Sequence, residues 1–301
     1  MTKLSSQNPT RQPPKSAVLL DGRRLAHEIK EKLKREVEGL KKSTNHVPRL
    51  VNVMIGEDHS SCAYANSQKR VAEEIGIQYT LATLPSTVSQ EELIRHIRRL
   101  NEDKSVHGIM IHKPVPSQIS YRAVANCVTV EKDLEGINVT NIGKMILGET
   151  KLIPCTPAAV MEHIKSTEVP LRGKEAVIIG HSEIVGKPLS LLLLEQYATV
   201  TICHVATSEA GKLIEHVGRA DVLIVAVGKA GLVKGEWIKQ GAMVIDVGIN
   251  QVNGQIQGDV EFESAKERAS FITPVPGGVG PVTVVMLMRN GIEALRSQIQ
   301  V

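Results

Sequence analysis

Aromatic side chains are scarce in this chain, which contains two Phe, one Trp and four Tyr among 301 residues. Its hydrophobic core must therefore be built from aliphatic residues rather than from stacked rings. No apolar run approaches the roughly 20 residues that a membrane-spanning helix needs. We therefore predict a soluble protein without a membrane partner, long enough for two domains that each bury a core.

Cysteine is also rare, and its spacing is informative. The four cysteines lie far apart and form no Cys-x-x-Cys pair: Cys62, Cys127, Cys155 and Cys203. This spacing argues against a zinc site and against a disulfide framework, and it fits a reducing compartment. We predict a cytoplasmic protein without a metal site.

Neither sign of charge dominates the chain, since 36 Lys and Arg stand against 32 Asp and Glu, giving a formal net charge of +4. The basic residues are mixed with acidic ones and rarely have aromatic neighbours, so we expect no nucleic-acid partner. Residues 1–16 are polar, contain proline and lack acidic residues. We interpret them as a flexible extension; a transit peptide is the alternative, although the segment lacks a clear amphipathic pattern.

Helical and strand patterns alternate along the first half of the chain. This alternation indicates a parallel sheet covered by helices on both faces. Gly76 follows one of the helices and fits a helix C-terminal cap. The predicted helices are 25–40, 64–74 and 93–101, and the predicted strands are 49–55 and 108–112.

The second half contains a more regular succession of short buried strands. It resembles a Rossmann-type domain, in which ligands bind beyond the carboxyl ends of the strands. A glycine turn, 180–186, joins the first strand to a helix; it is not Gly-x-Gly-x-x-Gly, and a purely structural turn is the alternative. The predicted strands are 176–179, 199–203, 222–227 and 243–247, and the helix is 188–196.

A loop rich in proline and glycine, 273–283, precedes the apolar run that starts at Val284. Three prolines restrict φ, and three glycines allow close approach of the backbone. Such a loop at a helix N-terminus favours polar or anionic ligands. A simple connection to a C-terminal helix is the alternative.

Eight segments stand out in order along the chain. They are Ser-Cys-Ala-Tyr at 61–64 on the helix that ends near Gly76, Val-His-Gly at 106–108, Glu-Lys-Asp at 131–133, Pro-Cys-Thr-Pro at 154–157, the glycine turn 180–186, Asp-Val-Gly-Ile-Asn at 246–250, Gly-Asp-Val at 258–260, and the loop 273–283. Together they resemble the bifunctional methylenetetrahydrofolate dehydrogenase/cyclohydrolase family, and the resemblance extends from about Leu19 to the C-terminus.

The resemblance implies an α/β fold with two domains flanking a cleft, the second of Rossmann type. Residues 17–155 and 284–301 would form the folate-binding catalytic domain, to which the C-terminal helix returns. Residues 156–283 would form the NAD(P)-binding domain. The implied reactions are oxidation of methylenetetrahydrofolate to the methenyl cation by hydride transfer, and hydrolysis of that cation to formyltetrahydrofolate. The family also implies a homodimer.

The match at the implied catalytic residues is uneven. Tyr64 coincides with a family tyrosine that packs beside folate, but Gln68 occupies the position of the catalytic lysine. Lys69 is one step further, about 100° around the helix, so we expect it to point elsewhere. Glutamine can orient a water, yet it cannot carry a proton near neutral pH.

His112 replaces a family glutamine that neighbours the lysine, and Lys113 follows it. We hypothesise that His112 has taken over a proton-handling role, because histidine titrates near physiological pH. The alternative is a histidine that only donates or accepts a hydrogen bond. Among the substrate-binding residues implied, Glu135 stands where the family has aspartate, and its carboxylate can accept two hydrogen bonds from the pterin. Pro276 and Gly277 match the closing loop.

The implied cofactor-binding residues are Gly180, His181, Ser182, Val205, Ile249 and Thr283. Members that use NADP usually have arginine where this chain has His181, and a serine where it has Val205. Losing these groups weakens recognition of a 2′-phosphate. The acidic residue typical of NAD enzymes is also absent after the second strand of this domain. His181 or His204 could supply positive charge, and we predict NADP with NAD as the alternative.

The predicted activity is that of an NAD(P)-dependent methylenetetrahydrofolate dehydrogenase, with a cyclohydrolase activity that is reduced or differently catalysed. A fully bifunctional enzyme, in which His112, Lys113 or water replaces the lysine, is one alternative. A non-catalytic folate-binding or regulatory relative is another, and a Rossmann dehydrogenase for a different substrate is a third. Cys155 and Asp259 also match family positions, and we assign them structural roles.

Overall fold

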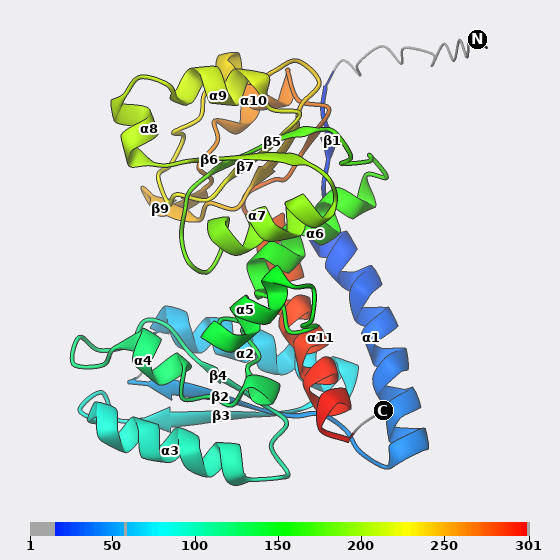
Figure 1. The fold of residues 1–301 in the computed structure, drawn as a ribbon, viewed down its shortest axis with the longest axis vertical. Helices are drawn as coiled ribbons and strands as arrows, with labels where there is room; N and C mark the ends of the chain where they lie inside the picture. The colour runs from blue at the N-terminus through cyan, green and yellow to red at the C-terminus, as the bar shows by residue number, and fades with distance from the viewer. Residues whose placement is uncertain (1–15, 57–58, 300–301) are drawn as a thin grey trace.

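The computed structural model describes residues 16–56 and 59–299, which form two α/β parts joined by long helices (Figure 1). The predicted extension 1–16 lies outside the described residues, apart from residue 16. The strands are β1 Val18–Leu19, β2 Arg49–Ile55, β3 Gln78–Leu84, β4 Gly108–Ile111, β5 Glu175–Ile179, β6 Thr199–Cys203, β7 Val222–Val225, β8 Met243–Asp246, β9 Asn250–Val252, β10 Gln255–Gln257 and β11 Phe271–Ile272.

The helices include both predicted and unpredicted segments. They are α1 Gly22–Thr44, α2 His59–Ile75, α3 Gln90–Glu102, α4 Tyr121–Ala125, α5 Val139–Ile146, α6 Cys155–Ser166, α7 Gly186–Glu195, α8 Val205–Glu209, α9 Leu213–Arg219, α10 Phe262–Lys266 and α11 Val279–Ile299, with 3₁₀ turns η1 Val130–Lys132 and η2 Gly235–Trp237.

The smaller sheet is parallel, with strand order β3-β2-β4, and it lies between α2 and α3 (Figure 1). Successive side chains of β2 enter different clusters: Leu50 packs with Ala72 of α2, whereas Val51 packs with Leu93 of α3. This alternation is the normal geometry of a strand covered on both faces. It confirms the predicted parallel sheet, although β3, a half-exposed edge strand, was not predicted.

The larger sheet has the order β1-β11-β8-β7-β5-β6, and all of its neighbouring strands are parallel. From β6 to β11 this is the doubly wound order 2-1-3-4-5, whose switch point lies between β5 and β7. The Rossmann-type prediction is thereby confirmed. The strand β1 falls within the segment 17–155 predicted for the first domain, yet it pairs with β11 of the other sheet.

The C-terminal helix α11 returns to the first part of the molecule and packs between α1 and α6, as predicted. It begins at Val279, five residues before Val284, so the predicted extent of the loop 273–283 was wrong at its end. Pro281 is compatible with this earlier start, because the first-turn N–H groups of a helix need no partner within the helix.

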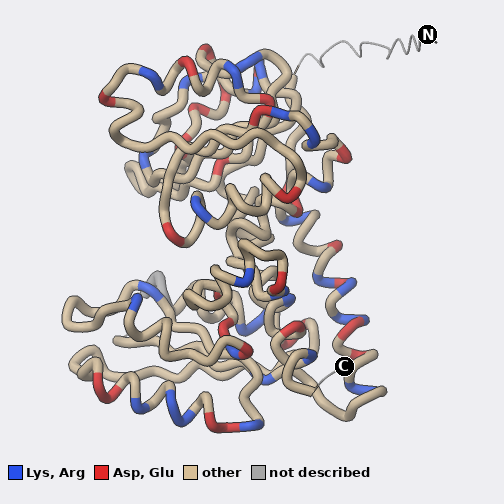
Figure 2. Tube along the Cα trace, viewed as in Figure 1, with Lys and Arg blue, Asp and Glu red and all other residues tan. Residues whose placement is uncertain are grey.

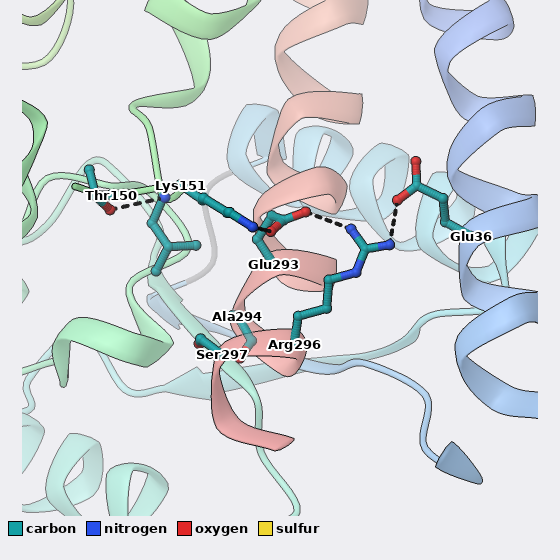
Figure 3. Close-up of polar contacts among 8 residues, drawn as sticks. Glu36, Thr150, Lys151, Glu293, Ala294, Arg296 and Ser297 are labelled. Carbon is teal, nitrogen blue, oxygen red and sulfur yellow. Dashed lines mark hydrogen bonds and ion pairs between the residues drawn. The ribbon is translucent and has the colours of Figure 1, made fainter. Parts of the chain in front are cut away.

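Polar contacts tie α11 to its neighbours. The amide nitrogen of Asn290 donates to the carbonyl oxygens of Leu134 and Ile153, each at 2.8 Å. Figure 3 shows Arg296 bridging Glu293 of its own helix and Glu36 of α1, at 2.6 and 3.0 Å. The Arg296 side chain is 30% exposed, whereas Asn290 is fully buried. The Asn290 hydrogen bonds therefore help to fix this helix against the segments that contain Leu134 and Ile153.

Lys and Arg alternate with Asp and Glu along both parts of the molecule (Figure 2). Within the described residues, no helix is both long and apolar enough to cross a membrane. The same residues include no group of three His, Cys, Asp or Glu placed to hold a metal ion.

Candidate active site

The buried face of α2 places Gln68 at the boundary between the small sheet and a cavity. Gln68 is 2% exposed, and Ala65 and Ala72 lie one turn away on the same buried face. Lys69, in contrast, is half exposed and lies 3.9 Å from Glu73 in an ion pair. The expectation that Lys69 points away from the site is confirmed.

Gln68 and His112 belong to one buried polar cluster. The oxygen Oε1 of Gln68 accepts hydrogen bonds from Asn52 Nδ2 at 3.1 Å and from the Tyr79 hydroxyl at 2.7 Å. Asn52 Nδ2 also lies 3.3 Å from Nδ1 of His112, which is 5% exposed. The small sheet provides the other members of this cluster: Asn52 is on β2, Tyr79 is on β3 and His112 directly follows β4.

Tyr64 lies one helical turn before Gln68 and borders the same cavity. Its ring centre is 6.0 Å from that of His112. Although 43% of the residue is exposed, desolvation of the phenol raises the pKa of Tyr64 to about 12. Tyr64 is therefore a neutral aromatic surface at neutral pH, suited to packing against a flat ligand.

Glu135 also lines this cavity. Its Oε2 accepts hydrogen bonds from the Tyr121 hydroxyl at 2.9 Å and from the backbone N–H of Ile111 at 3.4 Å. Burial raises the pKa of the Glu135 carboxyl to about 7. Lys113 does not contact this carboxylate directly; its Nζ lies 3.7 Å from the centre of the Tyr121 ring.

These residues line a cavity of about 210 Å³, which we call the Gln68 cavity. Carboxylate, amide, imidazole and phenol groups converge there on a space that is bordered by both apolar and polar side chains. Its lining residues are Tyr64, Gln68, Met110, His112, Lys113, Glu135, Ile137, Pro154, Cys155, Thr156, Ile184, Thr283 and Leu287. The structure thus brings Tyr64, Gln68, His112 and Glu135 together.

A second cavity, of about 220 Å³, lies below the loop before α11, and we call it the Pro276 cavity. Pro276, Gly277 and Ile249 line it, and Ile249 is 68% exposed. Thr283 lines the Gln68 cavity instead, one turn into α11. The residues implied for the closing loop are therefore divided between two cavities, with the start of α11 contributing to both.

The glycine turn after β5 leaves no room for a side chain at Gly180. Its φ is +122°, and a Cβ atom there would lie 2.3 Å from the carbonyl oxygen of Ala226. Ala226 follows β7, so the loops after β5 and β7 touch at the switch point, where a doubly wound sheet binds dinucleotides. The close contact between these two loops fits a site for a bound dinucleotide. Asp259 holds the loop after β7 by accepting the backbone N–H groups of Val227, Gly228 and Lys229, which agrees with its predicted structural role.

Two histidines meet at the carboxyl ends of β5 and β6. The ring centres of His181 and His204 are 5.2 Å apart. Val205, next along the chain, is 67% exposed, and Ser182 Oγ accepts the N–H of Val185 at 3.1 Å. These residues lie on the cofactor side of the fold, and their roles in binding stay predictions.

Three polar residues near the site were missed from the sequence: Asn52, Tyr79 and Tyr121. Asn52 carried a usable signal, because it is a polar residue in the middle of the apolar strand β2, and buried polar groups need partners. Tyr79 and Tyr121 carried none, since their partners lie on other elements of the chain.

The fold and these cavities define a two-domain α/β protein with a catalytic domain and a nucleotide-binding domain. Residues 20–135 match the model of the tetrahydrofolate dehydrogenase/cyclohydrolase catalytic domain, and residues 154–299 match that of the NAD(P)-binding domain of the same enzymes. The chain belongs to the bifunctional methylenetetrahydrofolate dehydrogenase/cyclohydrolase family. This confirms the resemblance, the fold class and the assignment to one-carbon tetrahydrofolate metabolism.

Relatives cover nearly the whole chain. The bifunctional protein FolD of Bacillus licheniformis is 46% identical over 95% of this chain and 99% of its own length. The crystal structure of FolD from Campylobacter jejuni has a TM-score of 0.90 and 40% identity, covering 93% of this chain and 99% of that one. The Trypanosoma brucei enzyme, complexed with NADP and an inhibitor, has a TM-score of 0.89 and 37% identity, covering 95% and 99%.

Proposed function

We propose that this chain oxidises 5,10-methylenetetrahydrofolate with NADP, or less well with NAD, and then hydrolyses the methenyl product. The main observation that supports this proposal is the Gln68 cavity, where Tyr64, Glu135 and His112 converge close to the dinucleotide-binding part of the fold. The two reactions follow from membership of the family, and we assign the residues of this cavity to the steps of those reactions. A generic dehydrogenase would not need Glu135 and Tyr64 in one cavity.

In the first reaction, the protein mainly positions its ligands. Glu135 accepts hydrogen bonds from the amino-pyrimidinone edge of the pterin, and Tyr64 packs beside the bound folate. The bound dinucleotide supplies the hydride acceptor, so oxidation of the methylene bridge gives a methenyl cation and reduced cofactor. Gly180, Ser182, Val205, Ile249 and Thr283 bind the dinucleotide, and Pro276 and Gly277 cover the folate.

In the second reaction, water adds to the methenyl carbon, the ring opens to the formyl product, and one proton is released. Gln68 orients this water, and the imidazole of His112 handles the proton, because glutamine cannot do so near neutral pH. General acid–base assistance of this kind contributes roughly 10²–10⁴-fold. The hydrolysis therefore proceeds in this chain without a lysine at position 68.

The assignments of compartment, oligomeric state, substrate and preferred cofactor follow from family membership and composition. We propose a cytoplasmic homodimer whose substrates are one-carbon derivatives of tetrahydrofolate. NADP is the preferred cofactor, with His181 and His204 as the side chains that contact its 2′-phosphate.

One assay tests the function. The purified chain is incubated with methylenetetrahydrofolate and either NADP or NAD, and reduced cofactor and methenyl product are followed separately. Reduction of the cofactor is expected with both dinucleotides and faster with NADP. Absence of reduction with either one would disprove the dehydrogenase activity.

A further inference from the structure

The carboxamide oxygen of Gln68 accepts hydrogen bonds from two buried donors on the sheet side of the residue. Asn52 is fully buried and Tyr79 is 9% exposed, and neither of them lines the Gln68 cavity. Both donate to the same atom, Gln68 Oε1, at 3.1 and 2.7 Å. The Tyr79 hydroxyl in turn accepts from Asn52 Nδ2 at 2.7 Å, which closes a three-membered ring of hydrogen bonds.

This ring fixes which end of the amide faces the ligand. A carbonyl oxygen has two lone pairs, and here two donors on the sheet side occupy them. The amide nitrogen Nε2 must then lie on the other side, toward Tyr64 and the cavity. Tyr64, one helical turn before Gln68, lines the same cavity.

We propose that Asn52 and Tyr79 are positioning residues that turn the Gln68 amide so that it presents only N–H groups to the Gln68 cavity. The ligand atom that it meets must therefore carry a lone pair, such as the oxygen of the attacking water. This inference rests on the proposed function only for the identity of that ligand. It assigns Gln68 the role of a donor that holds the water, and it leaves proton removal to another group.

The competing possibility is a reversed hydrogen-bond arrangement of Asn52, Gln68 and Tyr79. If the Asn52 amide turned over, its Oδ1 would face the cluster and accept from Gln68 Nε2. Gln68 would then offer an acceptor to the cavity. Asn52 Oδ1 is buried without a hydrogen-bond partner among the described residues, so the two arrangements differ in which buried atom is left unpaired.

Neutron diffraction from crystals of the full chain soaked in D₂O separates the two arrangements without any variant. Deuterons on Gln68 Nε2 that point toward Tyr64 and the cavity would support the proposal. Deuterons that point toward Asn52 would overturn it. This result does not depend on catalytic activity, so failure of the proposed hydrolysis and failure of the orientation are distinguishable.

Kinetics test the positioning role in the same protein. Tyr79→Phe removes one donor to Oε1 while keeping the ring, and we expect the kcat for methenyl hydrolysis to fall by up to about tenfold with little change in KM, since one hydrogen bond to Gln68 is lost. Tyr197→Phe, at an exposed position of the other domain, is the matched control and should change neither constant.

The decisive comparison repeats Tyr79→Phe in the Gln68→Lys background. An ammonium group donates in every direction and needs no orientation, so Tyr79→Phe should then change kcat by less than about twofold. An equal loss of kcat in both backgrounds would show that Tyr79 has a merely structural role and would overturn the proposal.

Discussion

Gln68 and Lys69 are adjacent in sequence, yet Gln68 lies buried in the cavity wall while Lys69 is half exposed and paired with Glu73. One step along a helix is enough to separate a cavity residue from a surface residue. The exposed lysine therefore cannot substitute for a lysine at position 68. The fold of α2 therefore keeps the ammonium group of Lys69 out of the cavity.

Gln68→Lys should raise the rate of methenyl hydrolysis by about tenfold or more, because it adds a group that can carry a proton in the cavity. The rate is measured from the loss of methenyl absorbance with purified variants. Lys69→Ala is the matched control and should leave this rate unchanged. A large loss in Lys69→Ala would contradict the assignment of that residue to the surface.

His112→Ala should slow methenyl hydrolysis by roughly tenfold or more, while the oxidation step falls less. The reason is that His112 is the residue of the buried cluster suited to proton transfer near neutral pH. Both reactions are measured on the same preparation. His112→Gln keeps hydrogen bonding without titration, so recovery of hydrolysis in that variant would show that His112 acts only through hydrogen bonds.

Folate binding should depend on pH through Glu135. Its pKa is raised to about 7 by burial, so below this value the carboxyl is protonated and one of its acceptor sites is lost. We expect tetrahydrofolate affinity, measured by calorimetry, to increase as pH rises through 7. Glu135→Gln should remove this dependence, and an unchanged pH profile in that variant would refute the assignment.

The same carboxyl predicts a trend in stability. Its pKa in the folded protein is above its ordinary value of 4.5, so the folded chain binds more protons than the unfolded chain between these two values. The free energy of unfolding of the ligand-free protein should therefore fall as pH rises through this window, by on the order of 1 kcal/mol per pH unit from this group. Denaturant unfolding of the wild type and Glu135→Gln across that range checks the sign.

Cofactor choice should depend on the pair His181 and His204, whose rings meet at the ends of β5 and β6. Replacing both with alanine should lower kcat/KM for NADP by about tenfold or more and change that for NAD much less, because only NADP carries the 2′-phosphate. The measurement is the ratio of the two kcat/KM values. Equal losses with both cofactors would place the histidines outside the phosphate site.

Much of the fold could be predicted from the sequence because its signals are local. The edge strand β6 has the predicted bounds, and β5 and β8 lie within one residue of theirs, since short aliphatic runs between turns define such strands. The start of α11 could not be placed, because its first turn reads as a proline-glycine loop. The edge strand β3 lacks a continuous apolar run and gave no comparable signal.

The candidate site was predictable only where a residue occupies a position that the family motifs mark. Gln68, His112 and Glu135 line one cavity, although they come from different elements. The contribution of Tyr79 could not be foreseen, since its hydroxyl meets Gln68 only after β3 pairs with β2. Long-range contacts of buried polar groups depend on this packing and leave no periodic pattern in the sequence.

We predict that the chain performs both reactions, with hydrolysis that does not use a lysine at position 68. Its most direct test is a single-turnover experiment with methylenetetrahydrofolate and excess NADP, in which reduced cofactor, methenyl and formyl products are resolved in time. We predict rapid cofactor reduction, transient accumulation of methenyl, and its slower conversion to formyl product faster than in buffer alone. Conversion of methenyl at the buffer rate would contradict the account.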